Sequence, residues 1–540
     1  MAKAQKKVKE ERLEDILWEC RENLRGKATM TDKRDLLLTL VFLKFMNDRY
    51  DEQVEKVMAE ANGDETLAKI LLKKAASFEK NGVIALPEEC RWQTLVETEP
   101  KKMAIALDAA IDILEKQERK LKNALPQGIF VSCALEPRVI KSVLDSVSKI
   151  DPKRFKEKDL IGRVYEYYLQ AFAINADKEE GEFYTPQSLV ELIATLIEPF
   201  DGTLYDPCCG SGGMFVQCAK LVEAKGGNTQ AINVYGQEVQ KETYRLAKMN
   251  LAIRGISYHL GDHAASTFTA DQHPDLKVDY IMANPPFNLK KWRGPEELKD
   301  DPRWKGYEVP PESNANYAWI LHMLSKLDPS EGVGGFLLAN GALDDSDTLN
   351  IRRELIKNDK VEAIIVLPRE MFYTTDISVT LWILNQNKKG GIKNGRRLRN
   401  RSGEVLFVDL RTWNQNIYEK KYVKFSEEQI AEVARIYHDW QGRAVSMKPP
   451  SGAGGRAGVP SPAERYAKPE FYYAATHDEI AEKDYSLVPS RYIEFVDRDT
   501  ELDYKTALKE IGSTASELVS RQKANAANLE AAFKALGVKI

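Results

Sequence analysis

Between residues 185 and 410 the chain alternates short β-rich runs with helical stretches, and this alternation restricts the fold more than any other feature. The runs, in chain order, are TLYD, INVYGQE, SYHLGD, VDYIMAN, GGFLLAN, VEAIIVLP, TLWILNQ and EVLFVDL. Such a pattern predicts an α/β fold with a mainly parallel sheet and helices on both faces. Because ligands of these sheets bind at the carboxyl ends of the strands, the residues directly after each run are the candidate functional residues.

The regions on either side of this segment have a different pattern. Apolar residues recur at helical spacing in LEDILWECRENL, RDLLLTLVFLKFMNDRY and KKMAIALDAAIDILEKQ, which predicts a helical N-terminal domain over residues 1–160. We assign 161–445 to the α/β domain, 446–463, rich in Gly, Pro, Ser and Ala, to a flexible linker, and 464–540 to a C-terminal region that ends in a helix. The apolar stripe expected on that helix consists of Leu502, Ala507, Leu508, Ile511, Leu518, Leu529 and Phe533.

The composition is that of an ordinary globular protein, with 43% hydrophobic residues and a net charge of only −4. Bulk charge therefore does not indicate a nucleic-acid-binding protein, and any basic surface has to be local or supplied by a partner. The six cysteines show no paired metal spacing, so we predict no metal site. The charged N-terminus lacks the apolar stretch of a signal peptide and residues 36–46 are too short to span a membrane, which indicates a cytoplasmic protein.

The one strongly basic stretch is KKGGIKNGRRLRNR, residues 388–401, which has seven basic residues and no acidic residue. It lies between two predicted strands. Two interpretations stay open, because such a stretch can contact the phosphates of a nucleic acid or form a solvated loop at a hairpin tip.

A glycine-rich motif directly follows the run TLYD. Its residues are Asp206, Pro207, Cys208, Cys209, Gly210, Ser211, Gly212, Gly213, Met214 and Phe215. Three glycines in four positions let the backbone turn sharply and approach a ligand closely. The motif is not a Walker loop, because no Gly-Lys-Ser/Thr follows, and it lacks the third glycine of a nicotinamide fingerprint. Taken alone, it also fits an ordinary tight turn.

Two further carboxylates end the next two runs. Glu238 ends INVYGQE, where a carboxylate can accept hydrogen bonds from both ribose hydroxyls of an adenosine, and Asp262 ends SYHLGD, where it can bind the adenine amino group. Each alone is also explained as a solvated acidic residue at a strand end. Three successive strands that each end in an acidic residue favour a binding site.

The sharpest signal is Asn284-Pro285-Pro286-Phe287, at the end of the run VDYIMAN. Two consecutive prolines cannot extend a helix or a central strand, so they predict a rigid loop. The Asn284 oxygen and a proline carbonyl can both accept hydrogen bonds from an exocyclic amine, which favours a pyramidal nitrogen able to attack a methyl sulfonium. Phe287 then offers a stacking face to a base flipped out of a duplex. The structural alternative is a Pro-Pro turn.

These motifs resemble those of the N6-adenine DNA methyltransferases. The segment Gly181-Glu182-Phe183-Tyr184-Thr185-Pro186-Gln187 precedes the glycine motif, and this order is that of the gamma class. More narrowly, the chain is similar to the modification subunit of type I restriction–modification systems, HsdM. The similarity extends to LLLTLVFLKFMNDRYDE, VEAIIVLPREMFYTTDISVTLWIL and YSLVPSRYI, and so covers most of the chain.

The resemblance implies a Rossmann-like methyltransferase domain with a helical N-terminal domain and a helical C-terminal tail, and S-adenosylmethionine as the cofactor. The cofactor residues it implies are Glu182, Phe183, Tyr184, Thr185, Pro186, Gln187, Asp206, Pro207, Gly210, Ser211, Gly212, Gly213, Glu238 and Asp262. The residues it implies for catalysis are Asn284, Pro285, Pro286 and Phe287. The expected partners are double-stranded DNA, a specificity subunit that binds two copies of this chain, and a restriction subunit as a further candidate.

Several alternatives remain at this stage. An Asn-Pro-Pro-aromatic motif also suits methylation of a protein glutamine or of cytosine N4, a non-catalytic scaffold would keep the fold, and a nicotinamide oxidoreductase would share the sheet. Two adjacent cysteines, Cys208 and Cys209, depart from the small residues common in the family and suggest sensitivity to oxidation. Pro207-Cys208 also spells the nucleophile dipeptide of cytosine-C5 methyltransferases, but its place inside the cofactor loop excludes that role.

Overall fold

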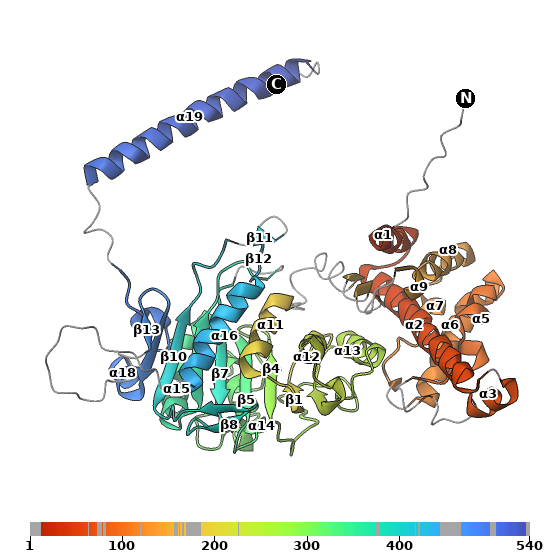
Figure 1. Cartoon of the computed structure of the whole chain (residues 1–540), viewed down its shortest axis with the longest axis horizontal. Coiled ribbons are helices and arrows are strands. Elements are labelled where there is room, and N and C mark those ends of the chain that lie inside the picture. The colour runs from red at the N-terminus through yellow and green to blue at the C-terminus, as the bar shows by residue number, and fades with distance from the viewer. Residues whose placement is uncertain are drawn as a thin grey trace.

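The structure is a computed structural model of the chain. It describes residues 12–62, 64–72, 78, 83–118, 121–155, 160, 163–164, 167–168, 185–224, 226–372, 377–415, 417–418, 422–442, 466–496 and 504–535. Figure 1 shows a group of helices near the N-terminus, a large sheet flanked by helices, and a long C-terminal helix that stands away from both.

Helices dominate residues 12–168, as the apolar periodicity predicts. They are α1 (Leu13–Asn23), α2 (Met30–Glu60), α3 (Glu65–Leu72), α5 (Trp92–Glu97), α6 (Met103–Gln117), α7 (Ile129–Ser132), α8 (Pro137–Ser148) and α9 (Pro152–Phe155), with 3-10 turns η1 (Glu88–Cys90) and η2 (Pro100–Lys102). Their core also includes Leu246, Met249 and Ile253 of α13 (Lys241–Ile253). The helical region therefore packs on a helix of the α/β region.

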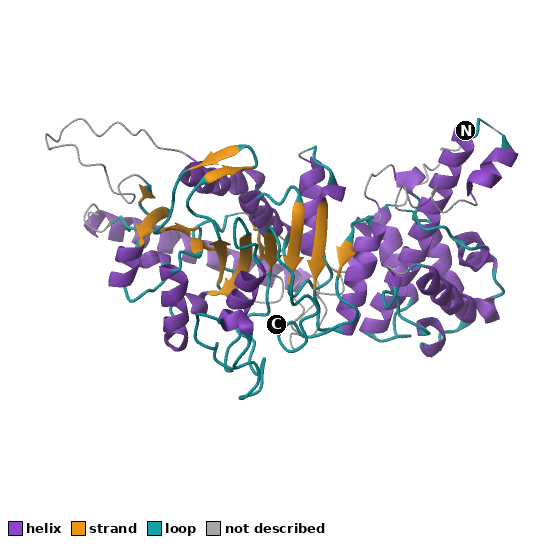
Figure 2. Cartoon of the chain, turned by 90° about the horizontal axis from the view of Figure 1, so that it is seen from below, coloured by secondary structure: helices purple, strands orange, loops and turns teal. Residues whose placement is uncertain are grey.

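The α/β region is built on a ten-stranded sheet with the order β13-β14-β10-β6-β7-β5-β4-β1-β2-β3. The strands are β1 (Gly202–Asp206), β2 (Ile232–Gly236), β3 (Tyr258–His259), β4 (Tyr280–Ala283), β5 (Val333–Ala339), β6 (Val361–Val366), β7 (Val379–Asn385), β10 (Glu404–Asp409), β13 (Ala467–Lys468) and β14 (Tyr472–Thr476). All eight runs expected from the sequence form strands of this sheet. In Figure 2 the strands cross the middle of the chain with helices on both sides.

Alternate residues of the strands enter two cores, one on each face of the sheet. Leu381 and Ile383 of β7 lie in the core with α11 (Gln187–Ile197), α12 (Gly213–Ala224) and α16 (Glu427–Gly442). On the opposite face, Trp382 and Leu384 lie in the core with α14 (Asn316–Lys326), α15 (Leu349–Lys357) and α18 (His477–Glu482). The predicted three-layer α/β arrangement is confirmed.

The strand directions are more mixed than expected. β3, β2, β1, β4 and β5 run parallel, but β7 is antiparallel to both of its neighbours, β5 and β6. β14 is also antiparallel to β10 and to β13. The carboxyl ends of β1, β2 and β4, which carry the motifs, still meet at one edge of the sheet.

The basic stretch 388–401 contains a small hairpin of β8 (Gly391–Lys393) and β9 (Arg396–Leu398). Lys393 donates a hydrogen bond to the Glu331 carbonyl and lies over the Tyr280 ring, so the hairpin sits where β4 and β5 begin. Four of its basic side chains form ion pairs within the chain: Lys388 with Asp359, Arg396 with Glu198, Arg399 with Glu404 and Arg401 with Glu362. The stretch is thus largely neutralised and lies at the sheet edge opposite the motifs.

The C-terminal helix is α19 (Tyr504–Ala535), and its described side chains are exposed. Leu508, Ile511 and Leu518 of the expected stripe are 61%, 65% and 60% exposed. Leu502 and the linker 446–463 lie outside the described residues, and nothing is described of the side chains of Ala507, Leu529 and Phe533. A second small hairpin pairs β11 (Ile417–Tyr418) with β12 (Tyr422–Val423).

Within the described part of the chain, no helix is long and apolar enough to cross a membrane. The same residues contain no group of three or more His, Cys, Asp or Glu side chains that could hold a metal ion.

Candidate active site

The glycine-rich loop connects β1 to α12 and begins with a buried carboxylate. Asp206 is 2% exposed and accepts a hydrogen bond from the backbone N–H of Cys208 at 3.0 Å. Gly210 and Gly212 have φ values of 53° and 78°, in the left-handed region that glycine adopts without strain. A Cβ built on Gly210 would meet nothing within 4 Å, so the backbone there faces open space. The loop can therefore take a ligand against its main chain.

Glu238 joins the loops after β1 and β2. Its Oε2 accepts a hydrogen bond from the Gly210 N–H at 3.1 Å, and its Oε1 accepts one from the Gln240 N–H at 2.8 Å. Parallel pairing also puts Asp206 opposite Gly236. The convergence expected from the strand ends is thus present for Asp206, Gly210 and Glu238.

Burial shifts the pKa values of the titratable groups in the glycine-rich loop. It raises the pKa of Asp206 to about 7, and the nearby Glu238 charge raises it further. Burial also raises the pKa of the Cys208 and Cys209 thiols well above the usual value, with the charge of Asp206 adding to the shift. Because the thiolate is the reactive form, burial and the neighbouring charges disfavour nucleophilic or oxidation chemistry at these cysteines, against the expected sensitivity.

Asn284, at the end of β4, is held by the segment that precedes α11. Its Nδ2 donates a hydrogen bond to Thr185 Oγ1 at 3.0 Å, across 99 residues of sequence. Its Oδ1 is buried and has no hydrogen-bond partner among the residues that the structure describes. A buried acceptor without a donor is costly, so this oxygen at the end of β4 is a candidate acceptor for a donor group of a ligand.

The other three residues of the motif differ in burial. Pro285 is buried, whereas Pro286 and Phe287 are half-buried. The Phe287 ring meets Phe372 edge to face, with centroids 5.6 Å apart and planes at 85°. Phe372, in the loop after β6, thus packs against the motif, a neighbour that our sequence interpretation did not identify. Its only sequence signal was an aromatic residue after a predicted strand.

The remaining residues of the predicted segment 182–187 differ in their exposure. Pro186 is buried at the start of α11, but Gln187 is exposed and donates a hydrogen bond to Glu191 at 2.6 Å. Glu182, Phe183 and Tyr184 lie outside the described residues.

Asp262 is exposed after β3. Its N–H donates a hydrogen bond to Gln272 Oε1 at 2.7 Å, and its carbonyl accepts one from Asn123 of the helical region at 3.4 Å. Its charge adds to the effect of burial, which raises the pKa of Tyr244 on α13 to about 12. The Asp262 carboxylate is therefore accessible and lies near α13, beside the other strand ends.

A layer of polar side chains, not anticipated from the sequence, holds the glycine loop through its carbonyls. The Thr267 hydroxyl donates to the Pro207 carbonyl, and Asn250 Nδ2 donates to the Ser211 carbonyl at 2.8 Å. Arg303 in turn donates to the carbonyl of Thr267 at 2.9 Å. Pro207 and Ser211 are thus fixed by their main chain.

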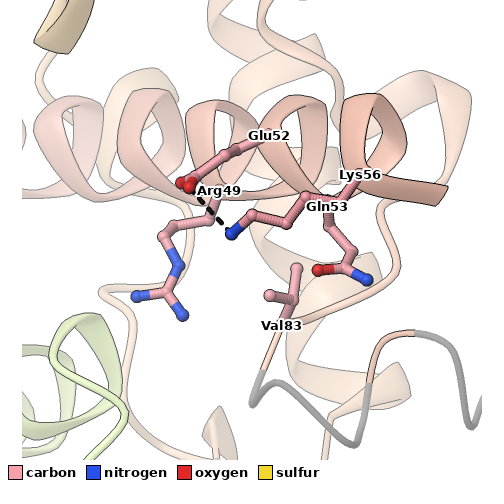
Figure 3. Close-up of a pocket in the computed structure, with 5 residues that line it drawn as sticks. All are labelled: Arg49, Glu52, Gln53, Lys56 and Val83. Atoms are coloured by element: carbon pink, nitrogen blue, oxygen red, sulfur yellow. Dashed lines mark ion pairs between the residues drawn. The ribbon is translucent and has the colours of Figure 1, made fainter. Parts of the chain in front are cut away.

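A cavity of about 370 Å³ lies elsewhere, in the helical region. Arg49, Glu52, Gln53, Lys56 and Val83 line it, and Figure 3 shows the ion pair between Glu52 and Lys56 along α2. None of these residues belongs to the motifs, and the pair is more than half exposed. The cavity contains no residue of the glycine loop or of the Asn-Pro-Pro-Phe motif, so we do not assign the chemistry to it.

A sheet of this order, with a glycine loop after β1, carboxylates after β1 and β2 and Asn-Pro-Pro-Phe after β4, defines an α/β methyltransferase that acts on an amino group. Sequence comparison agrees. Residues 156–501 match the N-6 DNA methylases and residues 13–147 match the HsdM N-terminal domain. The chain therefore belongs to the N-6 DNA methylase family, among the HsdM methylase subunits of type I restriction–modification systems.

Individual relatives support this membership. The chain is 36% identical to the type I restriction enzyme HindI methylase subunit of Haemophilus influenzae, over 83% of this chain and 98% of that protein. It is 31% identical to the MjaIX methylase subunit of Methanocaldococcus jannaschii, over 97% and 91%. In fold it is similar to a type I methyltransferase subunit from Streptococcus thermophilus, with a TM-score of 0.69 at 22% identity over 89% and 98% of the two chains.

This membership confirms the expected activity, N6-adenine methylation of DNA by the modification subunit of a type I system. It decides against cytosine N4, protein glutamine and nicotinamide chemistry.

Proposed function

We propose that this chain binds S-adenosylmethionine on the loops after β1, β2 and β3 and methylates an adenine held by Asn284, Pro285, Pro286 and Phe287. The observation that carries the proposal is the buried Asn284 Oδ1, which has no donor in the described part of the chain, on a side chain whose Nδ2 is held by Thr185. The reaction takes place in the cytoplasm, where the DNA substrate is found.

The residues present fit the cofactor. Glu238 offers two carboxylate oxygens, now bound to the Gly210 and Gln240 N–H groups, to a pair of ribose hydroxyls. The open backbone at Gly210 admits the ligand, and the exposed Asp262 is free to accept from an adenine amino group. When bound, S-adenosylmethionine supplies a methyl group on a sulfonium, which is already a good electrophile.

The work of the chain is then positioning. Asn284 Oδ1 and the Pro285 carbonyl accept the two N–H bonds of the target amine, which turns the nitrogen lone pair toward the methyl group. Thr185 fixes the Asn284 side chain in the orientation that this requires. Phe287, braced edge to face by Phe372, stacks on a flipped adenine. No covalent intermediate with the chain is needed, because the sulfonium is itself a good electrophile. The acceptors of the chain would orient the amine and stabilise the charge that develops on it.

We further propose that a specificity subunit reads the DNA sequence and that two copies of this chain bind one such subunit. Leu508, Ile511, Leu518 and Val519 are all more than half exposed and recur at spacings of three, seven and one along α19. Such spacing places them on one helix face, which fits an apolar face of a partner helix. A restriction subunit joins the same complex as a further component.

The test is an incubation of the chain, alone and co-purified with the product of its genomic neighbour, with tritiated S-adenosylmethionine and unmethylated genomic DNA. Genomic DNA contains the recognition site whatever its sequence. Hydrolysis of the labelled DNA should yield N6-methyladenine. Label in N4-methylcytosine or in protein, or no label from the complex, would contradict the proposal.

A further inference from the structure

The segment that directly follows the catalytic motif is closed at its base by asparagines. We call residues 288–315, between Phe287 and α14, the post-motif loop. Asn288 Oδ1 accepts hydrogen bonds from Asn314 Nδ2 at 3.2 Å and from Asn316 Nδ2 at 3.0 Å. The Leu289 carbonyl accepts a further bond from the Ala315 N–H at 2.9 Å. The two ends of the loop are thus tied together beside the motif.

A buried tryptophan anchors the loop a few residues further on. Trp292 is 6% exposed, donates its indole N–H to the Pro311 carbonyl at 2.9 Å and packs on Phe268 with centroids 4.7 Å apart. Lys290 and Lys291 lie between the anchors Leu289 and Trp292, and both are exposed. The φ of Lys291 is 53°, a left-handed conformation that is uncommon outside glycine and persists where neighbours hold it.

The basic side chains of the loop differ in what they bind. Arg293 donates to the carbonyls of residues 294, 295, 297 and 310, and Lys299 pairs with Glu296 at 2.7 Å. Arg303 pairs with Asp301 at 2.6 Å. For Lys290 and Lys291, by contrast, the described part of the chain provides no ion pair and no hydrogen bond. Lys305 is likewise exposed, with no side-chain ion pair or hydrogen bond among the described residues. Of these three unneutralised cations, Lys290 and Lys291 lie nearest to the motif in the chain, between two anchored residues.

We propose that Lys290 and Lys291 contact the phosphates that flank the target adenine on the DNA strand being methylated. This inference rests on the proposed function, in which the motif receives that adenine. Lys290 is three residues beyond Phe287, so their backbones lie at most roughly 11 Å apart. Flipping a base rotates the backbone around the flanking phosphates, and cations held in place beside the pocket stabilise that strand. Because phosphates carry no base information, these lysines position the strand and leave sequence recognition to other residues.

The test uses the variant Lys290→Gln/Lys291→Gln in the full chain, co-purified with its specificity partner, on unmethylated genomic DNA. We expect the KM for DNA to rise by roughly 3- to 10-fold at unchanged kcat and unchanged affinity for S-adenosylmethionine. The slope of log(kcat/KM) against log[salt] should become less steep by about 0.9 for each phosphate that no longer binds a lysine. Lys290→Arg/Lys291→Arg keeps the charge and should keep the wild-type slope.

The matched control is Lys389→Gln/Arg397→Gln, which removes the same charge from exposed residues of the β8–β9 region at the opposite sheet edge. It should leave KM and the salt slope unchanged. An unchanged slope in the Lys290/Lys291 variant, a fall in kcat alone, or an equal effect of the control would overturn the inference. Absence of methylation by the wild-type complex would instead contradict the proposed function.

Discussion

Thr185 Oγ1 accepts a hydrogen bond at 3.0 Å from Asn284 Nδ2, so the segment ahead of the sheet orients the amide at the end of β4. The bond joins residues 99 positions apart and leaves the Asn284 Oδ1 buried without a donor. The side chain expected to accept the target amine is therefore oriented before any substrate arrives, which is how preorganised sites reduce the cost of reaching the transition state.

Replacing Asn284 should separate catalysis from cofactor binding. Asn284→Ala removes an acceptor that acts mainly in the transition state, so turnover should fall by roughly 100-fold or more. Calorimetry should give an unchanged affinity for S-adenosylmethionine. Asn284→Asp keeps an acceptor oxygen and should retain more activity than the alanine variant. Near-wild-type turnover of Asn284→Ala would remove this residue from the mechanism.

Thr185 should act through Asn284. Thr185→Val keeps the side-chain shape but loses the acceptor, and loss of one neutral hydrogen bond of about 0.5–1.5 kcal/mol should lower kcat by roughly 2- to 12-fold. Thr185→Ser restores the hydroxyl and should restore kcat. If the serine variant were as slow as the valine variant, orientation of the amide would not be the cause.

Glu238 should contribute to cofactor affinity. Glu238→Ala removes a charge-assisted acceptor worth ~1.5–3 kcal/mol, which corresponds to roughly 10- to 150-fold in the Kd for S-adenosylmethionine. Glu238→Gln keeps the shape of the side chain and one acceptor oxygen. Its Kd for S-adenosylmethionine should lie between those of the wild type and Glu238→Ala. Equal affinities of all three proteins in calorimetry would show that the ribose binds elsewhere.

Asp206 should make stability depend on pH. Burial raises its pKa from 3.8 to about 7, so the folded chain holds this proton more tightly than the unfolded chain does. The stability contribution is complete below the unfolded pKa and is lost as the pH rises through the folded pKa. Asp206→Asn abolishes this titration, so its Tm relative to the wild type should be higher at pH 8 than at pH 5. Parallel Tm curves across this range would contradict the assignment.

The exposed face of α19 should be needed for assembly rather than for the site. Leu508→Glu/Ile511→Glu should prevent formation of a complex of two copies with one specificity subunit, as measured by light scattering. Ser513→Glu, about half a turn away from the stripe, is the matched control. The isolated wild-type chain should bind cofactor but methylate DNA poorly. Efficient methylation of one defined sequence by the chain alone would contradict the partner proposal.

Local patterns predicted the strands and the loops, but not the contacts between distant segments. Every β-rich run forms a strand, because each is a short apolar run, and β4, β5, β6, β7 and β10 are buried along their whole length. The reversal of β7 was not predicted, since apolar runs of parallel and antiparallel central strands look alike. The strands β8, β9 and β13 have only two or three residues, too few to show a period. β14 is as long as β1 and β2 but was not predicted.

In the candidate site, too, local patterns predicted single residues but not the contacts between distant segments. Asp206, Gly210, Glu238 and Asn284 were predicted because each lies at the carboxyl end of a strand or within four residues of it. The contact of Asn284 with Thr185 and the packing of Phe287 on Phe372 depend on tertiary neighbours. For the same reason, the charge pattern of residues 388–401 gave no sign that their cations pair with acidic residues along and beside the strands.

The helical region and the cofactor loop share α13. This helix buries Leu246, Met249 and Ile253 in the core of the helical region, while its Asn250 holds the Ser211 carbonyl of the glycine loop. Unfolding of the helical region would therefore expose the apolar face of α13, whose Asn250 holds the glycine loop. The two regions should consequently unfold together in a single thermal transition. A ligand that binds only the folded chain raises the Tm of that transition for both regions. Saturating cofactor should thus protect cleavage sites in α2 and α6 from protease, although no residue of those helices is expected to touch it.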